Sequence, residues 1–226
     1  MNKYIKQRAK EIVQNDMPTM LIGTGFFVLI SYLTSYITGD IVANVIHGFV
    51  ATLITACSAC FYFRAYNRGH GDLKDIYFIL TDKDNYAKIA SLMLAMWVIN
   101  TLVNIASGFA AFIPLIGLVC ILIATLIVHY LLRMVWFLFV ANTQYPTEYY
   151  FKGSSKYMGS QIVAFFVFTI SVMFVPAIIE GLLGTVINSS VAEFLCIPLD
   201  AYIDLALAGF LSSIIPNEWF DGTVNV

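Results

Sequence analysis

The sequence predicts an all-α, polytopic membrane bundle of six transmembrane helices. Its 226 residues are 60% hydrophobic and 12% charged, with a mean hydropathy of +0.82. A soluble domain is about 45–50% apolar and about 25% charged. Six apolar stretches are each long enough to cross roughly 30 Å of hydrocarbon as a helix. They cover residues 18–37, 41–63, 89–113, 115–141, 161–183 and 191–215.

Charged residues avoid these six stretches, which supports their assignment as membrane spans. Of the 26 Asp, Glu, Lys and Arg residues, only Arg133, Glu180, Glu193, Asp200 and Asp204 fall inside them. The longest polar stretch is residues 64–88, about 25 residues, which leaves no room for a soluble catalytic domain. The first stretch lacks a small-x-small cleavage site, so we interpret it as a span and not as a signal peptide.

The basic residues orient the bundle. Eleven of the twelve lie in residues 1–17, 64–88 and 142–160, whereas the intervening turns at 38–40, 114 and 184–190 carry none. If all six stretches span, these eleven residues share one side. By the positive-inside rule that side is the cytoplasm. The sequence therefore predicts a multi-pass cell-membrane protein with both termini cytoplasmic.

A short amphipathic segment precedes each predicted hairpin. These segments are expected to be interfacial helices over about 2–15, 72–81 and 147–158, because mixed apolar and polar faces suit the headgroup layer. In the second, Asp72, Lys74 and Asp75 are expected on the polar side. The apolar positions are Tyr4, Ile5, Ile12 and Val13 in the first segment, Leu73, Ile76, Tyr77 and Leu80 in the second, and Tyr150, Phe151 and Met158 in the third.

Prolines and cysteines have structural interpretations. Pro18, Pro114 and Pro146 punctuate the ends of elements, whereas Pro176 and Pro198 lie within the last two spans and are expected to kink them. The Cys57-x-x-Cys60 pair shares one face of the second span. Because no further ligands accompany it, we expect it to pack between helices and not to bind a metal.

Three stretches resemble a family of uncharacterised integral membrane proteins of Gram-positive bacteria, numbered 975 among the domains of unknown function. They are Ile5-Lys6-Gln7-Arg8-Ala9-Lys10-Glu11, Asp72-Leu73-Lys74-Asp75-Ile76-Tyr77-Phe78, and the segment from Tyr145-Pro146-Thr147-Glu148 through Ser155-Lys156-Tyr157-Met158-Gly159. The likeness covers nearly the whole chain in order and spacing. This chain departs from the family in having Leu115, where a glycine usually follows Ile-Pro. The resemblance implies the same membrane architecture and no particular activity.

Acidic residues within the last span form the candidate functional site. Glu193, Asp200 and Asp204 share one helix face, and Glu180 could approach Glu193 across the outer turn. Carboxylates inside a membrane are costly and usually face a bundle interior or water. One interpretation is a cation or proton path, or an acidic pocket for a cationic substrate. The alternative is structural pairing or placement at the interface.

Arg133 is the lone basic residue within a predicted span, and His129 lies one turn earlier on the same face. An unpaired guanidinium in hydrocarbon is expensive, so we expect a carboxylate partner, Asp200 or Asp204. The alternative is that the fourth span ends early and Arg133 snorkels to the headgroups.

Two functions fit these residues, and a third is weaker. The first is a non-enzymatic accessory or structural envelope protein, with the lipid bilayer and other membrane proteins as partners. The second is a small transporter, exporter or immunity-type permease that uses the acidic face of the last helix. A lipid-acting enzyme would need a nucleophile or metal set beside its carboxylates, and no such motif is present. We expect no cofactor and no metal. The net charge of −2, with no large basic surface, indicates no nucleic-acid partner.

Overall fold

The computed structural model describes residues 2–37, 39, 41–110, 116–187 and 189–221, and all their regular structure is helical. The long helices of the first two thirds are α2 (Met17–Thr34), α3 (Ile41–Arg68), α5 (Tyr86–Ala110) and α6 (Ile116–Ala141). They are followed by α7 (Thr147–Val186) and α9 (Ile197–Ile214). The shorter elements are α1 (Asn2–Asn15), the 3₁₀-helices η1 (Leu73–Tyr77) and η2 (Lys83–Asn85), α4 (Phe78–Thr81), α8 (Ser189–Leu195) and α10 (Asn217–Asp221).

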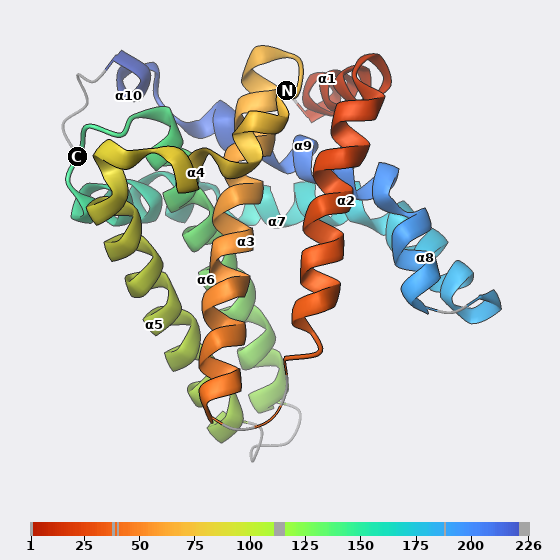
Figure 1. Cartoon of the computed structure of the whole chain (residues 1–226), viewed down its shortest axis with the longest axis horizontal. Coiled ribbons are helices and arrows are strands. Elements are labelled where there is room, and N and C mark those ends of the chain that lie inside the picture. Colours follow the sequence, from red (N-terminus) through yellow and green to blue (C-terminus); the bar gives the residue numbers. More distant parts are fainter. Residues whose placement is uncertain (1, 38, 40, 111–115, 188, 222–226) are drawn as a thin grey trace.

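The long helices form two sets that cross each other. Helices α2, α3, α5 and α6 run along one direction, and α7 passes across them (Figure 1). Helix α3 is central, since it contacts α2, α5, α6 and α9. The candidate site is lined by residues of α2, α3 and α6 from the first set and of α7 from the second.

Five helices among the described residues are long and apolar enough to cross a membrane, so the prediction of six is wrong for this part of the chain. The five are Met17–Thr34, Val42–Arg68, Lys83–Val103, Thr147–Val186 and Ile197–Ile214. The expected span at 115–141 is helix α6, but its described apolar part is Tyr130–Ala141. The side chains of most of the preceding residues of α6 lie outside the described part of the chain, and α6 is not among the five helices. The expected turn at Pro114 lies outside the described residues.

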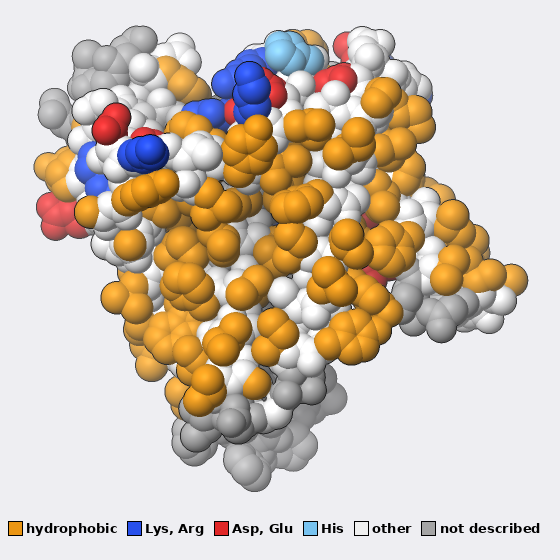
Figure 2. Space-filling view, in the orientation of Figure 1, with side chains coloured by type: hydrophobic (Ala, Val, Ile, Leu, Met, Phe, Trp, Pro, Cys, Tyr) orange, Lys and Arg blue, Asp and Glu red, His pale blue; other side chains and the backbone are white. Residues whose placement is uncertain are grey.

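Charged side chains gather at one end of the face shown in Figure 2, and apolar side chains cover most of the rest. Helices α1, α4 and α10 lie at that end, whereas α2 ends and α3 begins at the opposite end (Figure 1). Two of the three predicted basic segments, 1–17 and 64–88, therefore have elements at a common end of the fold. A multi-pass membrane protein has this distribution of charge.

Helix α1 differs from the interfacial helix expected over 2–15, because its apolar face packs on protein. Ile5, Ala9, Ile12 and Val13 are buried, and α1 contacts α9, with Tyr4 left exposed. Gly209 of α9 makes the close approach possible. A Cβ at that position would stand 2.4 Å from the Tyr66 ring and 2.9 Å from Ile5.

The expected amphipathic helix over 72–81 is replaced by η1 and the four-residue α4. Helix α3 ends at Arg68, and Gly69 follows with φ of 84°, the left-handed conformation that often terminates helices. Asp72 then begins η1 by accepting a hydrogen bond from the Lys74 amide. The expectation that Asp75 faces solvent is wrong: its side chain is buried, because arginines on α3 pair with it.

The last third also departs from the expected boundaries. Helix α7 joins the expected interfacial helix 147–158 to the span 161–183 without a break, since Gly159-Ser160 between them contains no proline to interrupt the helix. The helix continues through Pro176. The expected span 191–215 is instead two helices, α8 and α9, separated at Cys196. Pro198 occupies the first turn of α9, where a proline costs no hydrogen bond.

Candidate functional site: an acidic cavity between the helices

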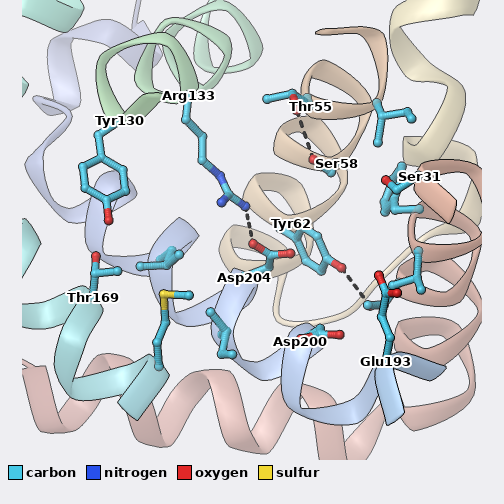
Figure 3. Close-up of a pocket in the computed structure, with 17 residues that line it drawn as sticks. Ser31, Thr55, Ser58, Tyr62, Tyr130, Arg133, Thr169, Glu193, Asp200 and Asp204 are labelled. Atoms are coloured by element: carbon cyan, nitrogen blue, oxygen red, sulfur yellow. Dashed lines mark hydrogen bonds and ion pairs between the residues drawn. The ribbon is translucent and has the colours of Figure 1, made fainter. Parts of the chain in front are cut away.

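A cavity of about 520 Å³ lies between α2, α3, α6, α7, α8 and α9 (Figure 3). Its charged lining residues are Arg133, Glu193, Asp200 and Asp204. Its hydroxyl-bearing lining residues are Thr24, Ser31, Thr55, Ser58, Tyr62, Tyr130 and Thr169. Four of the six residues of the predicted polar site are thus brought to one cavity. The residues that line it come from six different helices, so its shape depends on the packing of the whole bundle.

Arg133 enters this cavity from α6 and pairs with Asp204 of α9 (Figure 3). Its Nη2 donates to Asp204 Oδ1. The Arg133 side chain is only 11% exposed, which does not fit a residue that snorkels to the headgroups. The carboxylate partner expected for Arg133 is therefore present. Arg133 Nε is buried without a hydrogen-bond partner, so this guanidinium is only partly satisfied.

The other two carboxylates of the cavity, Asp200 and Glu193, have no side-chain hydrogen bond or ion pair with any described residue. Both side chains are partly buried. Asp200 lies one turn before Asp204 on α9 and Glu193 lies on α8, and both line the cavity with Asp204 (Figure 3). With one arginine and three carboxylates, the ionised cavity has an excess of two negative charges.

Hydroxyl groups extend the polar lining along α3. Tyr62 Oη and Thr24 Oγ1 form a hydrogen bond of 2.8 Å between α3 and α2. Thr55 and Ser58 donate to backbone carbonyls of their own helix, at Ala51 and Thr55 respectively. Each of these two hydroxyl oxygens keeps acceptor capacity for another donor. The polar lining is therefore dominated by hydrogen-bond acceptors.

Two residues of the predicted site are not placed in the cavity. Glu180 is exposed on α7 and is not among the residues that line it. His129 belongs to α6, and its side chain lies outside the described part of the chain. Sequence reasoning missed Thr55, Ser58 and Tyr62. Their spacing of three and four residues gave a signal, since it places three hydroxyls on one helix face.

No group of three or more His, Cys, Asp or Glu side chains with metal-binding geometry occurs among the described residues. Cys57 and Cys60 are free, buried thiols of α3 and belong to the hydrophobic core. The three carboxylates of the cavity could instead attract an organic or hydrated cation.

A second charged cluster lies at the C-terminal end of α3, which is at the charged end of the fold. Asp75 of η1 accepts from Arg64 Nη1 at 2.9 Å and from Arg68 Nη1 at 2.7 Å. The Arg64 guanidinium carbon also lies 3.5 Å from the centre of the Phe78 ring, a close cation–π contact. We call Arg64, Arg68 and Asp75 the arginine clamp. Both of its arginines are paired with its single carboxylate.

Comparison with known proteins gives no match for this chain among protein-family models, curated proteins or solved structures. The likeness to family 975 stays a prediction.

Proposed function

We propose that this polytopic membrane protein is a transporter of a cationic ligand and that the acidic cavity is its binding site. The observation that carries the proposal is the pair of carboxylates, Asp200 and Glu193, that line a cavity between apolar helices without a cationic partner. Ionisable groups among the apolar helices of a membrane protein are expensive, and they often mark the path of an ion, a proton or water. The proposed function is non-enzymatic.

The chemistry of the cavity favours an organic cation with an apolar body. The carboxylates supply the charge, and the cavity wall also includes Phe27, Val28, Ile54 and Met173. Pockets of about 300–1,000 Å³ hold drug-sized ligands, and this cavity falls within that range. An anionic ligand would face three carboxylates and would have only Arg133, already paired with Asp204, to receive it.

Ethidium is a suitable probe, because it is a planar aromatic cation whose fluorescence rises when it leaves water. We expect saturable binding to the purified protein in lipid nanodiscs. We expect Asp200→Asn to weaken it at least tenfold, about 1.4 kcal/mol. Asp84→Asn is the matched control, since Asp84 is an exposed carboxylate of η2. Equal saturable binding by the protein and Asp200→Asn, or no saturable binding at all, would overturn the proposal.

Transport itself requires a second measurement in proteoliposomes. We expect ethidium uptake into vesicles that contain the protein and DNA, whose binding of ethidium reports its arrival. Vesicles with Asp200→Asn are expected to behave like protein-free vesicles. Binding without uptake would limit the function to cation binding.

An accessory or structural role is the second candidate. It is favoured by the apolar side chains that α7 exposes along much of its length, including Val163, Val167, Phe174 and Leu182. These side chains suit contact with lipid or with a helix of another membrane protein. This role predicts a stoichiometric protein partner in affinity purification from native membranes. It also predicts that polar substitutions on this face of α7 remove the partner while Asp200→Asn does not.

A further inference from the structure

A second cavity, of about 250 Å³, lies between α3, α5 and α6 on the other side of the contact between α3 and α6. Its lining includes His47, Thr52, Thr55, Asn100, Leu132 and Trp136. Thr55 lines both this cavity and the acidic one. Helix α6 also borders both, with Leu132 on the second cavity and Arg133 on the acidic one. The two cavities are therefore neighbours that share Thr55 in their lining.

Small and polar residues form a continuous face of α3 along both cavities. Gly48, Thr52, Thr55, Ser58 and Tyr62 succeed one another at intervals of three or four residues, so they share one side of the helix. Thr52 donates to the Gly48 carbonyl at 2.9 Å, as Thr55 does to Ala51 at 3.0 Å. Each hydroxyl is thus held by its own helix, and its oxygen remains able to accept a hydrogen bond from water.

The second cavity lies towards the end of the bundle where α2 and α3 connect. His47 is six residues into α3, about 9 Å along its axis, and its Nδ1 lies 2.9 Å from the Thr34 carbonyl of α2. Tyr62, in the acidic cavity, follows 15 residues later, about 22 Å further along the helix. The polar face therefore covers most of the roughly 30 Å thickness of a hydrocarbon layer.

From this continuity we propose that the second cavity is a water-filled access path that leads from the α2–α3 end of the bundle, past Thr55, to the acidic cavity. Water is the ligand, because the lining supplies hydroxyl, amide and imidazole groups and no charged side chain among the described residues. A cavity of this volume holds several water molecules, and water needs two to four polar partners. The path deepens the proposed function, on which it rests, by giving the cation site an aqueous route to the side opposite the charged end.

Cysteine accessibility tests the path without requiring a transported ligand. We would introduce Thr52→Cys or Asn100→Cys and treat intact cells and inverted vesicles with a membrane-impermeant trimethylammonium methanethiosulfonate. Peptide mass spectrometry would locate the label and separate it from native cysteines. Leu102→Cys is the matched control. Leu102 is 59% exposed on α5 only two residues from Asn100, at similar depth, but about 200° away around the helix.

We expect both cavity positions to be modified from outside the cell at least tenfold faster than Leu102→Cys, because the reagent attacks thiolates and these form in water and not in lipid. Ala51→Leu, which fills the second cavity, is expected to slow the modification of Thr55→Cys at least tenfold. Modification no faster than at Leu102→Cys, or from the cytoplasmic side only, would overturn the path. Ethidium binding to the native protein is measured separately, so a failed path and a failed cation site are distinguishable.

Discussion

The arginine clamp and the acidic cavity answer the same physical problem, the placement of charge in an apolar fold, in opposite ways. In the clamp, one buried carboxylate, Asp75, is matched by two arginines that lie within eleven residues of it in sequence. In the cavity, one arginine pairs with Asp204 across 71 residues, and Asp200 and Glu193 are left over. The clamp is saturated and serves stability. The cavity keeps unpaired charge, which costs stability, and the proposed cation binding would give that charge a partner.

The clamp is expected to give the largest loss of stability. Asp75→Ala leaves Arg64 and Arg68 without their carboxylate, and breaking a buried pair costs about 3–5 kcal/mol. Both arginines are partly exposed, so we expect about 3 kcal/mol, the low end of that range. The measurement is the thermal unfolding midpoint in detergent, with Asp84→Ala as the exposed control. If Asp75→Ala and Asp84→Ala unfold alike, the clamp contributes no stability.

Arg133→Ala is expected to cost less, about 2 kcal/mol, because it removes one charged hydrogen bond and leaves Asp204 with partial access to the cavity. In the double variant Arg133→Ala/Asp204→Asn, the stranded charge is gone, and more than half of the loss should be recovered. The yield of folded, monodisperse protein in detergent measures both. An additive loss in the double variant would show that the two residues do not act as a pair.

Tyr62→Phe probes the neutral part of the cavity and is expected to cost about 1 kcal/mol. It removes the 2.8 Å hydrogen bond to Thr24 and leaves that buried hydroxyl with fewer partners. Thermal unfolding of Tyr62→Phe, Thr24→Ser and the double variant would measure it, since Thr24→Ser keeps the hydroxyl. A larger loss for Thr24→Ser than for Tyr62→Phe would point to packing instead of the hydrogen bond.

Asp200→Asn is expected to change stability least, within about 0.5 kcal/mol, because no described partner is lost and a like charge beside Asp204 is removed. The same variant is expected to weaken ethidium binding at least tenfold. Thermal unfolding and ethidium binding should be measured on one preparation, so that the effect of Asp200→Asn on stability can be compared directly with its effect on binding. A clear loss of stability would place Asp200 with Asp75 as a structural acid.

The sequence was sufficient to predict a carboxylate partner for Arg133, because a guanidinium in an apolar span requires one wherever the helices lie. Few carboxylates occur within the predicted spans, which limited the candidates to Asp200 and Asp204. The sequence misplaced Asp75 for the complementary reason. Helical periodicity assigned that residue to a solvated face, but η1 follows a 3₁₀ path beside two arginines of α3. Amphipathic patterns describe an isolated helix and carry no information on a neighbouring partner.

Boundaries in the last third of the chain depended on competing local effects. Pro198 was consistent with a kinked helix and with a new first turn, and the structure takes the second option after Cys196. Gly159-Ser160 separated the predicted interfacial helix 147–158 from the predicted span 161–183, but it contains no group that blocks a helix, and α7 runs through it. The cavity itself needed the packing of six helices and could be predicted only as a set of acidic residues on one face.

The contact between α1 and α9 has a consequence for biosynthesis. Ile5 of α1 and Gly209 of α9 are 204 residues apart in the sequence, so their contact can form only after the helices between them have been synthesised, although α1 also contacts α2 and α3. Until then the apolar side of α1 lacks the α9 surface that covers it in the folded protein. The α1–α9 contact can therefore close only late, because it joins segments that lie far apart in the chain.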